Sequence, residues 1–72
     1  MDTTTLVLDR RGDEETARRI REVLDGEDGV ARVLTRSDRG EVYVRHSAAR
    51  APRRRLLARL EAEGVHVRVK GR

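Results

Sequence analysis

A chain of 72 residues is long enough for one domain with a small core, and it leaves little room for an enclosed active site. It carries 17 basic and 13 acidic side chains, a formal net charge of +4, which favours an acidic partner. The absence of cysteine excludes disulfides, thiolate metal ligands and thiol catalysis. We find no apolar run of membrane-spanning length and no secretion signal, so the expected location is the cytoplasm.

The chain begins with a predicted strand and a predicted helix. Residues 3–9 are rich in β-branched side chains and place Leu6 and Leu8 on one face, which indicates a strand. Residues 13–25 carry apolar side chains at helical spacing. Asp13 is a suitable N-cap for this helix, and the two glutamates after it favour the positive end of the helix dipole.

A hairpin follows. Residues 30–36 and 41–46 alternate apolar and polar side chains, so both segments predict strands. The short turn between them ends at Gly40, which we expect to adopt a positive φ angle.

The chain ends with a second predicted helix and a last strand. Residues 53–63 place their leucines on one side, and Pro52 is typical of a helix start. Gly64 is expected just after the helix, at the position that favours left-handed backbone. Residues 65–70 then predict a strand with its three valines facing inward.

These elements follow one another in the order βαββαβ. Two helices with one apolar stripe each must cover one face of a four-stranded sheet. Right-handed crossovers then favour a ferredoxin-like α+β fold with an antiparallel sheet in the order 4-1-3-2. We therefore expect a single ferredoxin-like domain over residues 1–72.

Apolar residues and glycines recur at fixed positions from about residue 5 to residue 67 without a gap. They are Leu6, Leu8, Ile20, Leu24, Gly29, Val30, Val33, Gly40, Val42, Val44, Leu56, Leu60 and Gly64. This spacing resembles that of the heavy-metal-associated domains of copper chaperones, mercury-binding proteins and metal-pumping ATPases. The resemblance implies a ferredoxin-like fold and docking on other domains through the loop of residues 9–16, by complementary charge.

The chain departs from that family at the metal-binding motif. Asp13 and Thr16 stand where the family has its two cysteines, and Arg10 and Arg11 precede them. Soft ions such as Cu(I) prefer thiolates, whereas a carboxylate and a hydroxyl are hard ligands and arginines repel cations. We therefore predict no thiolate metal site and no cofactor. A hard-ion site at Asp13 and the next two glutamates is the alternative to a simple helix cap.

The face of the sheet that points away from the helices is predicted to be basic. By alternation it carries Val7, Arg32, Leu34, Arg36, Tyr43, Arg45, His66, Arg68 and Lys70. RNA-recognition modules use this face with aromatic and arginine side chains. Arg32, Arg36, Tyr43, Arg45 and Arg68 are therefore a candidate anion or nucleic-acid site. The alternatives are a solvated face and a subunit interface through its apolar members, so we expect a monomer or a weak homodimer.

A second basic feature lies at the start of the second predicted helix. Arg53, Arg54 and Arg55 occupy its first turn, where the helix dipole disfavours positive charge. They are a second candidate anion site. The alternative is that the arginines extend into water over apolar surface.

The residues with catalytic potential form no recognisable constellation. We expect His46 and His66 on the surface, and Ser37 and Ser47 in turns. Neither histidine has a neighbouring cysteine or serine in an arrangement typical of a metal site or a catalytic triad. We therefore expect no enzymatic activity.

Three hypotheses for function follow from these observations. The first is a protein-docking or regulatory module that resembles a heavy-metal-associated domain without its thiolates. The second is an anion or nucleic-acid binder that uses the basic sheet face. The third is a designed ferredoxin-like protein with no biological function. The chain lacks Asn, Gln, Phe and Trp as well as cysteine, a narrow alphabet that either a GC-rich genome or an engineered sequence would explain, although the lack of Gln does not follow from a GC-rich genome.

Overall fold

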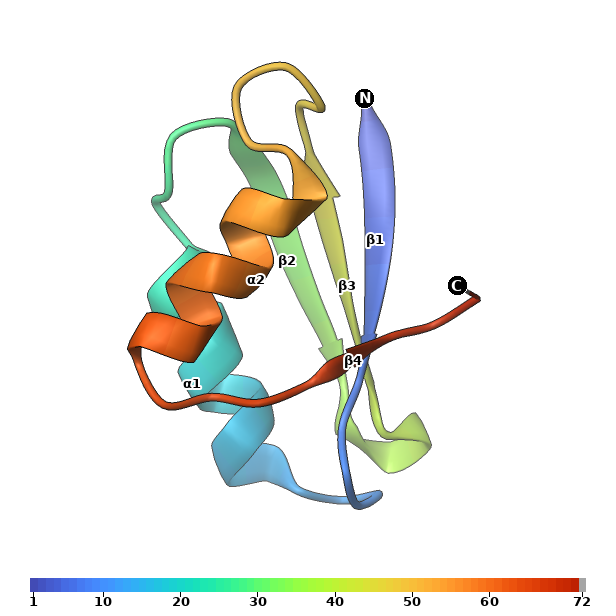
Figure 1. Ribbon diagram of the computed structural model, residues 1–72. Coiled ribbons are helices and arrows are strands. Elements are labelled where there is room, and N and C mark those ends of the chain that lie inside the picture. The colour runs from blue at the N-terminus through green and yellow to red at the C-terminus, as the bar shows by residue number, and fades with distance from the viewer. Residues whose placement is uncertain (72) are drawn as a thin grey trace.

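A computed structural model of the protein describes residues 1–71. Its elements are β1 (Asp2–Val7), α1 (Glu14–Leu24), β2 (Val30–Arg36), the 3₁₀ turn η1 (Ser37–Arg39), β3 (Glu41–His46), α2 (Arg53–Ala62) and β4 (Arg68–Val69) (Figure 1). The strands form one antiparallel sheet in the order β2-β3-β1-β4. The predicted ferredoxin-like fold and sheet order are confirmed.

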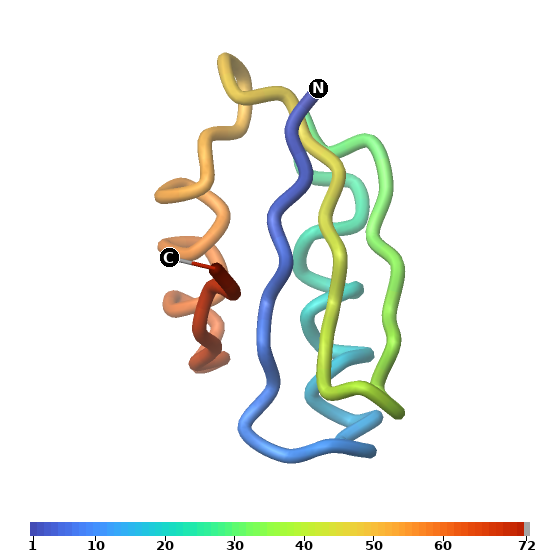
Figure 2. Tube along the Cα trace, turned by 90° about the vertical axis from the view of Figure 1, so that its right-hand side faces the viewer, coloured from blue at the N-terminus to red at the C-terminus, as the bar shows by residue number. Residues whose placement is uncertain are grey.

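Both helices lie on the same side of the sheet (Figures 1 and 2). In Figure 2 the strands β1, β3 and β2 lie in front and α1 lies behind them, so the view looks onto a face that no helix covers. Within residues 1–71, both helices are too short and too polar to cross a membrane.

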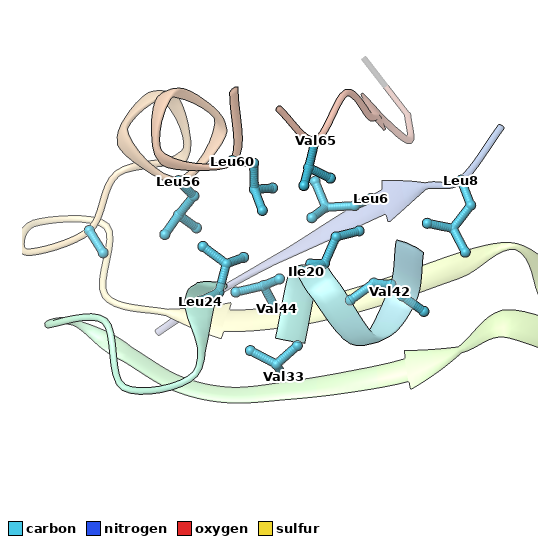
Figure 3. Packing of buried hydrophobic residues seen from close by; sticks show 12 residues of the cluster. Leu6, Leu8, Ile20, Leu24, Val33, Val42, Val44, Leu56, Leu60 and Val65 are labelled. Carbon is cyan, nitrogen blue, oxygen red and sulfur yellow. The ribbon is translucent and has the colours of Figure 1, made fainter. Parts of the chain in front are cut away.

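The core forms between the helices and the covered face of the sheet, as strand alternation and helical spacing require (Figure 3). Its buried apolar members come from every strand and helix except the short β4, and from the segments that connect them. They are Leu6, Leu8, Ala17, Ile20, Leu24, Val33, Val42, Val44, Ala51, Leu56, Leu60 and Val65. The predicted inward residues Leu6, Leu8 and Val65 are among them, whereas Val67 and Val69 are partly buried and pack against this core.

The last strand is shorter than the sequence predicts. We expected a strand over residues 65–70, but the strand contains only Arg68–Val69, and the N–H of Lys70 adds one bond of 2.9 Å to the Thr5 carbonyl of β1. The N–H of Gly64 donates to the Glu61 carbonyl at 2.9 Å, and the N–H of Val65 donates to the Leu60 carbonyl at 2.9 Å. These two bonds form the Schellman cap of α2, with Gly64 at φ +77°. Because the Val65 N–H caps a helix, this residue cannot join the sheet ladder.

The expectation that His46 lies on the surface is wrong. His46 continues the inward alternation of β3 after Val42 and Val44, and its side chain is buried. Its Nδ1 lies 2.7 Å from the Ala51 carbonyl oxygen, which can only accept, so Nδ1 carries the proton. Its Nε2 lies 2.7 Å from Thr4 Oγ1 on β1. The imidazole therefore ties β1, β3 and the segment before α2 together. His66, by contrast, is exposed as predicted, although it precedes β4 rather than belonging to it.

Replacement of His46 by Ala tests this junction. The variant leaves the Ala51 carbonyl and the Thr4 hydroxyl without their partner in the core, and it opens a cavity. We expect the free energy of unfolding to fall by about 2–4 kcal/mol, measured by urea denaturation. The matched control is His66→Ala, which removes an exposed imidazole and should leave stability unchanged. Equal effects of the two substitutions would contradict the junction.

Candidate functional site

Three rows of side chains cross the uncovered face of the sheet from β2 through β3 to β1. The strand register defines them as Arg32–Arg45–Thr3, Leu34–Tyr43–Thr5 and Arg36–Glu41–Val7. We call these nine residues the outer face. Six of its members were predicted there from alternation alone, namely Val7, Arg32, Leu34, Arg36, Tyr43 and Arg45.

The first row holds two positive charges directly opposite each other. Arg32 and Arg45 are register partners on β2 and β3, beside a register irregularity between Val30 and Arg32. Both side chains are exposed, and neither forms an ion pair with any of residues 1–71. Like charges directly opposite each other destabilise a sheet. This pair therefore costs stability without visible compensation inside the described chain.

The second row is apolar. Leu34 is 44% exposed, which is unusual for a leucine of this small domain, and Tyr43 beside it is half-buried. Together with the first row they line a shallow depression of about 220 Å³, whose walls are Thr3, Arg32, Leu34, Tyr43 and Arg45. The outer face thus combines an apolar centre with two unpaired guanidinium groups.

The third row contains an acidic residue that the sequence analysis missed. The Glu41 carboxylate accepts hydrogen bonds from the Tyr43 hydroxyl and, at 2.6 Å, from Lys70 Nζ. The bond from Lys70, followed by that from Tyr43, lowers the pKa of Glu41, and Glu41 raises the pKa of Lys70. The spacing of two residues between Glu41 and Tyr43 already placed both on one face. Lys70 therefore remains charged, and its charge is compensated by the Glu41 carboxylate.

The remaining basic residues of the predicted site lie apart from the first row. Arg36 pairs with Asp38 at 3.5 Å, beside the hairpin turn. Arg68 lies exposed on β4, at the opposite edge of the sheet from β2. The structure therefore brings Arg32, Arg45 and Tyr43 together and leaves Arg36 and Arg68 at the periphery.

The three arginines at the start of α2 lie on the helix layer, away from the outer face. Arg53 Nε lies 3.4 Å from Thr4 Oγ1, and Arg55 donates to the Arg50 carbonyl at 2.9 Å. Arg54 is exposed. Pro52 occupies the N-cap position and provides no side-chain cap. Arg53 and Arg55 therefore already have partners within the domain.

The loop of residues 9–16 is closed by its own hydrogen bonds. The Thr16 N–H donates to Asp13 Oδ1 at 3.1 Å, and the Thr16 hydroxyl donates to Asp13 Oδ2 at 2.7 Å. The loop is also held to the hairpin turn, because the N–H of Gly12 donates to the Ser37 carbonyl at 2.6 Å. Asp13 is thus the N-cap of α1, as predicted. Among residues 1–71, no group of three or more His, Asp or Glu side chains is arranged to hold a metal ion.

Cations and hydrogen-bond donors around an exposed apolar centre suit the binding of carboxylates or phosphates on an open surface. No protein-family model and no curated protein gives a significant match to the chain. Function is therefore inferred from the outer face itself.

Replacement of Asp13 tests the helix cap. The hydrogen bonds from Thr16, the hydroxyl bond first, lower the pKa of Asp13 below its ordinary value of 3.8. A carboxyl whose pKa is lower in the folded state than in the unfolded state stabilises the fold at pH values above its ordinary pKa. This contribution is lost as the pH falls through the lower pKa of the folded state. We therefore expect Asp13→Ala to be less stable than the parent protein at pH 7, with the difference shrinking below pH 3.8.

Asp13→Asn is the control for this experiment, because an amide still caps the helix but does not titrate. Its stability should exceed that of the alanine variant. Urea denaturation across the acid range provides the measurement. A difference between Asp13→Ala and the parent that persists unchanged in acid would contradict the role of the ionised carboxylate.

Proposed function

We propose that this protein is a non-catalytic docking module that binds an acidic segment of another protein at the outer face. The observation that carries the proposal is the unpaired Arg32–Arg45 pair beside exposed Leu34. A local cost in stability with no internal compensation is typical of a functional surface. An acidic partner would neutralise both guanidinium groups at once. We place this activity in the cytoplasm as part of the same proposal.

The composition of the outer face supports a protein partner. Arg and Tyr are enriched among the residues that dominate binding energy at protein interfaces, and they act best around a desolvated apolar centre. Leu34 and Tyr43 provide that centre, with Arg32 and Arg45 beside it.

The resemblance to heavy-metal-associated domains favours docking as the kind of function, but the charges favour a different surface. Around the loop of residues 9–16, Arg10 and Arg11 stand next to the acidic Asp9 and Asp13. Mixed charge of this kind attracts neither sign of partner strongly. The first row of the outer face is purely basic, so we propose it as the docking surface in preference to the loop.

Nucleic-acid binding is a second candidate, favoured by the position of Tyr43 between exposed arginines. Stacking of bases on aromatic rings supplies much of the affinity of single-strand binders. Tyr43 is the one aromatic residue of the chain, and its hydroxyl is engaged by the Glu41 carboxylate. A single ring beside a negative charge supports phosphate-rich ligands poorly, so we rank this function below acidic protein.

Two probes separate these functions. A fluorescent polyglutamate peptide and a fluorescent single-stranded oligonucleotide are titrated with the protein, and anisotropy is recorded at low and at physiological salt. We expect the peptide to bind and Arg32→Glu/Arg45→Glu to weaken binding at least about tenfold. The control is Arg54→Glu, which reverses an exposed charge on the helix layer and should bind as the parent does.

Each other result has a defined meaning. Binding of the oligonucleotide alone, with a steep dependence on salt, would replace the proposal by the second candidate. Equal losses in the control and in the outer-face variant would remove the outer face as the site. Absence of binding by either probe at about 10⁻³ M would favour a designed fold without a ligand.

A further inference from the structure

The sheet has one long free edge. β2 contains seven residues and is the terminal strand of the order β2-β3-β1-β4, so one side of its backbone faces no strand among residues 1–71 (Figure 2). Alternate N–H and C=O groups of such a strand point away from its neighbour. The opposite edge is β4, which has two residues only. The domain therefore offers one edge on which a further strand can form.

A groove runs beside this free edge on the helix side of the sheet. It lies between α1 and the end of β2, has a volume of about 460 Å³, and is lined by Glu14, Ala17, Arg18, Arg21, Thr35 and Ser37. A strand added to β2 would point every second side chain into this groove and the intervening side chains toward the outer face.

Basic side chains flank the free edge on both sides. Arg18 and Arg21 reach the groove from α1, whereas Arg32 and Arg36 lie on the outer face of β2. Of these four, only Arg36 forms an ion pair within residues 1–71, with Asp38 at 3.5 Å. The groove also contains Glu14, so one set of the alternating side chains of an added strand would meet two arginines and one acid. The other set would meet Arg32 and Arg36.

We propose that β2 accepts an extended acidic segment of a partner protein as a fifth strand, with carboxylates placed against the arginines on both sides. This rests on the proposed function and specifies the chemistry and conformation of the partner. Main-chain hydrogen bonds to β2 supply affinity, and the charged pairs supply specificity. A second copy of this chain is disfavoured as occupant, because β2 carries arginine and no acid, so self-pairing would bring like charges together.

The size of the edge limits the strength of the contact. Seven residues of strand extend about 23 Å at roughly 3.3 Å per residue, which is short for a stable interface. Binding by the strand alone is therefore weak and fast in exchange, and it suits titration followed by NMR at millimolar peptide.

Three short synthetic peptides test the proposal with the full-length protein. The first alternates glutamate with valine, the second alternates lysine with valine, and the third is the first peptide with N-methyl groups on alternate amides. We expect the glutamate peptide to bind and to slow hydrogen exchange at β2 amides. The lysine peptide should not bind. N-methylation keeps the charge but removes donors to β2, so it should weaken binding at least about tenfold.

Protein variants locate the contact. Arg18→Glu and Arg32→Glu should each weaken binding of the glutamate peptide several-fold, because they reverse charge on the two sides of the edge. Arg68→Glu, on β4 at the opposite edge, is the matched control and should bind as the parent does. Loss of binding in both edge variants but not in the control supports strand addition.

Two contrary outcomes are distinguishable. If the N-methylated peptide binds as well as the first one, or if Arg18→Glu has no effect, strand addition is wrong while docking of acidic protein at the outer face stands. If no acidic peptide binds at millimolar concentration, both the strand addition and the proposed function fail.

Discussion

Both helices bury their apolar stripes on the same face of the sheet, and every other feature of the surface depends on this arrangement. Side chains alternate along a strand. When the helices cover one face of the sheet, every second residue of β1, β2 and β3 is therefore left on the face that no helix covers. Those positions are filled by three arginines, two threonines, three apolar or aromatic side chains and a single acid, so basic groups outnumber acidic ones. A small domain with one core thus leaves its opposite face open to solvent, and this is the face that we propose as the binding surface.

The covered face contains one polar junction among its apolar side chains. His46 bridges Thr4 on β1 and the Ala51 carbonyl before α2, and no buried side-chain nitrogen or oxygen in residues 1–71 lacks a partner. A satisfied polar group of this kind fixes the relative position of the strands and helix more specifically than apolar contact does. Arg53 lies 3.4 Å from the same threonine hydroxyl, so one of the three arginines at the start of α2 contributes to the fold.

The spacing of apolar residues predicted the order of the elements, the handedness of crossovers then predicted the sheet topology, and the residue type of Asp13 predicted the cap of α1. The length of β4 was not predictable in this way, because the cap of α2 uses the Val65 N–H and pairing with β1 begins only at Arg68. His46 was misplaced because its residue type was given more weight than its alternation with Val42 and Val44. The spacing of Glu41 from Tyr43 is visible in the sequence, but its contact with Lys70 depends on the pairing of β4 with β1, which no local pattern shows.

We propose that the Arg32–Arg45 pair lowers the stability of the free domain and serves to bind an acidic partner. Urea denaturation of Arg32→Thr against Arg36→Thr tests this claim, because both variants place the same strand-favouring residue on β2 but Arg36 lies opposite Glu41. We expect a higher denaturation midpoint for Arg32→Thr than for Arg36→Thr at low salt. The difference should shrink at high salt, because salt screens the charges. A midpoint for Arg32→Thr equal to or below that of Arg36→Thr at low salt would contradict it.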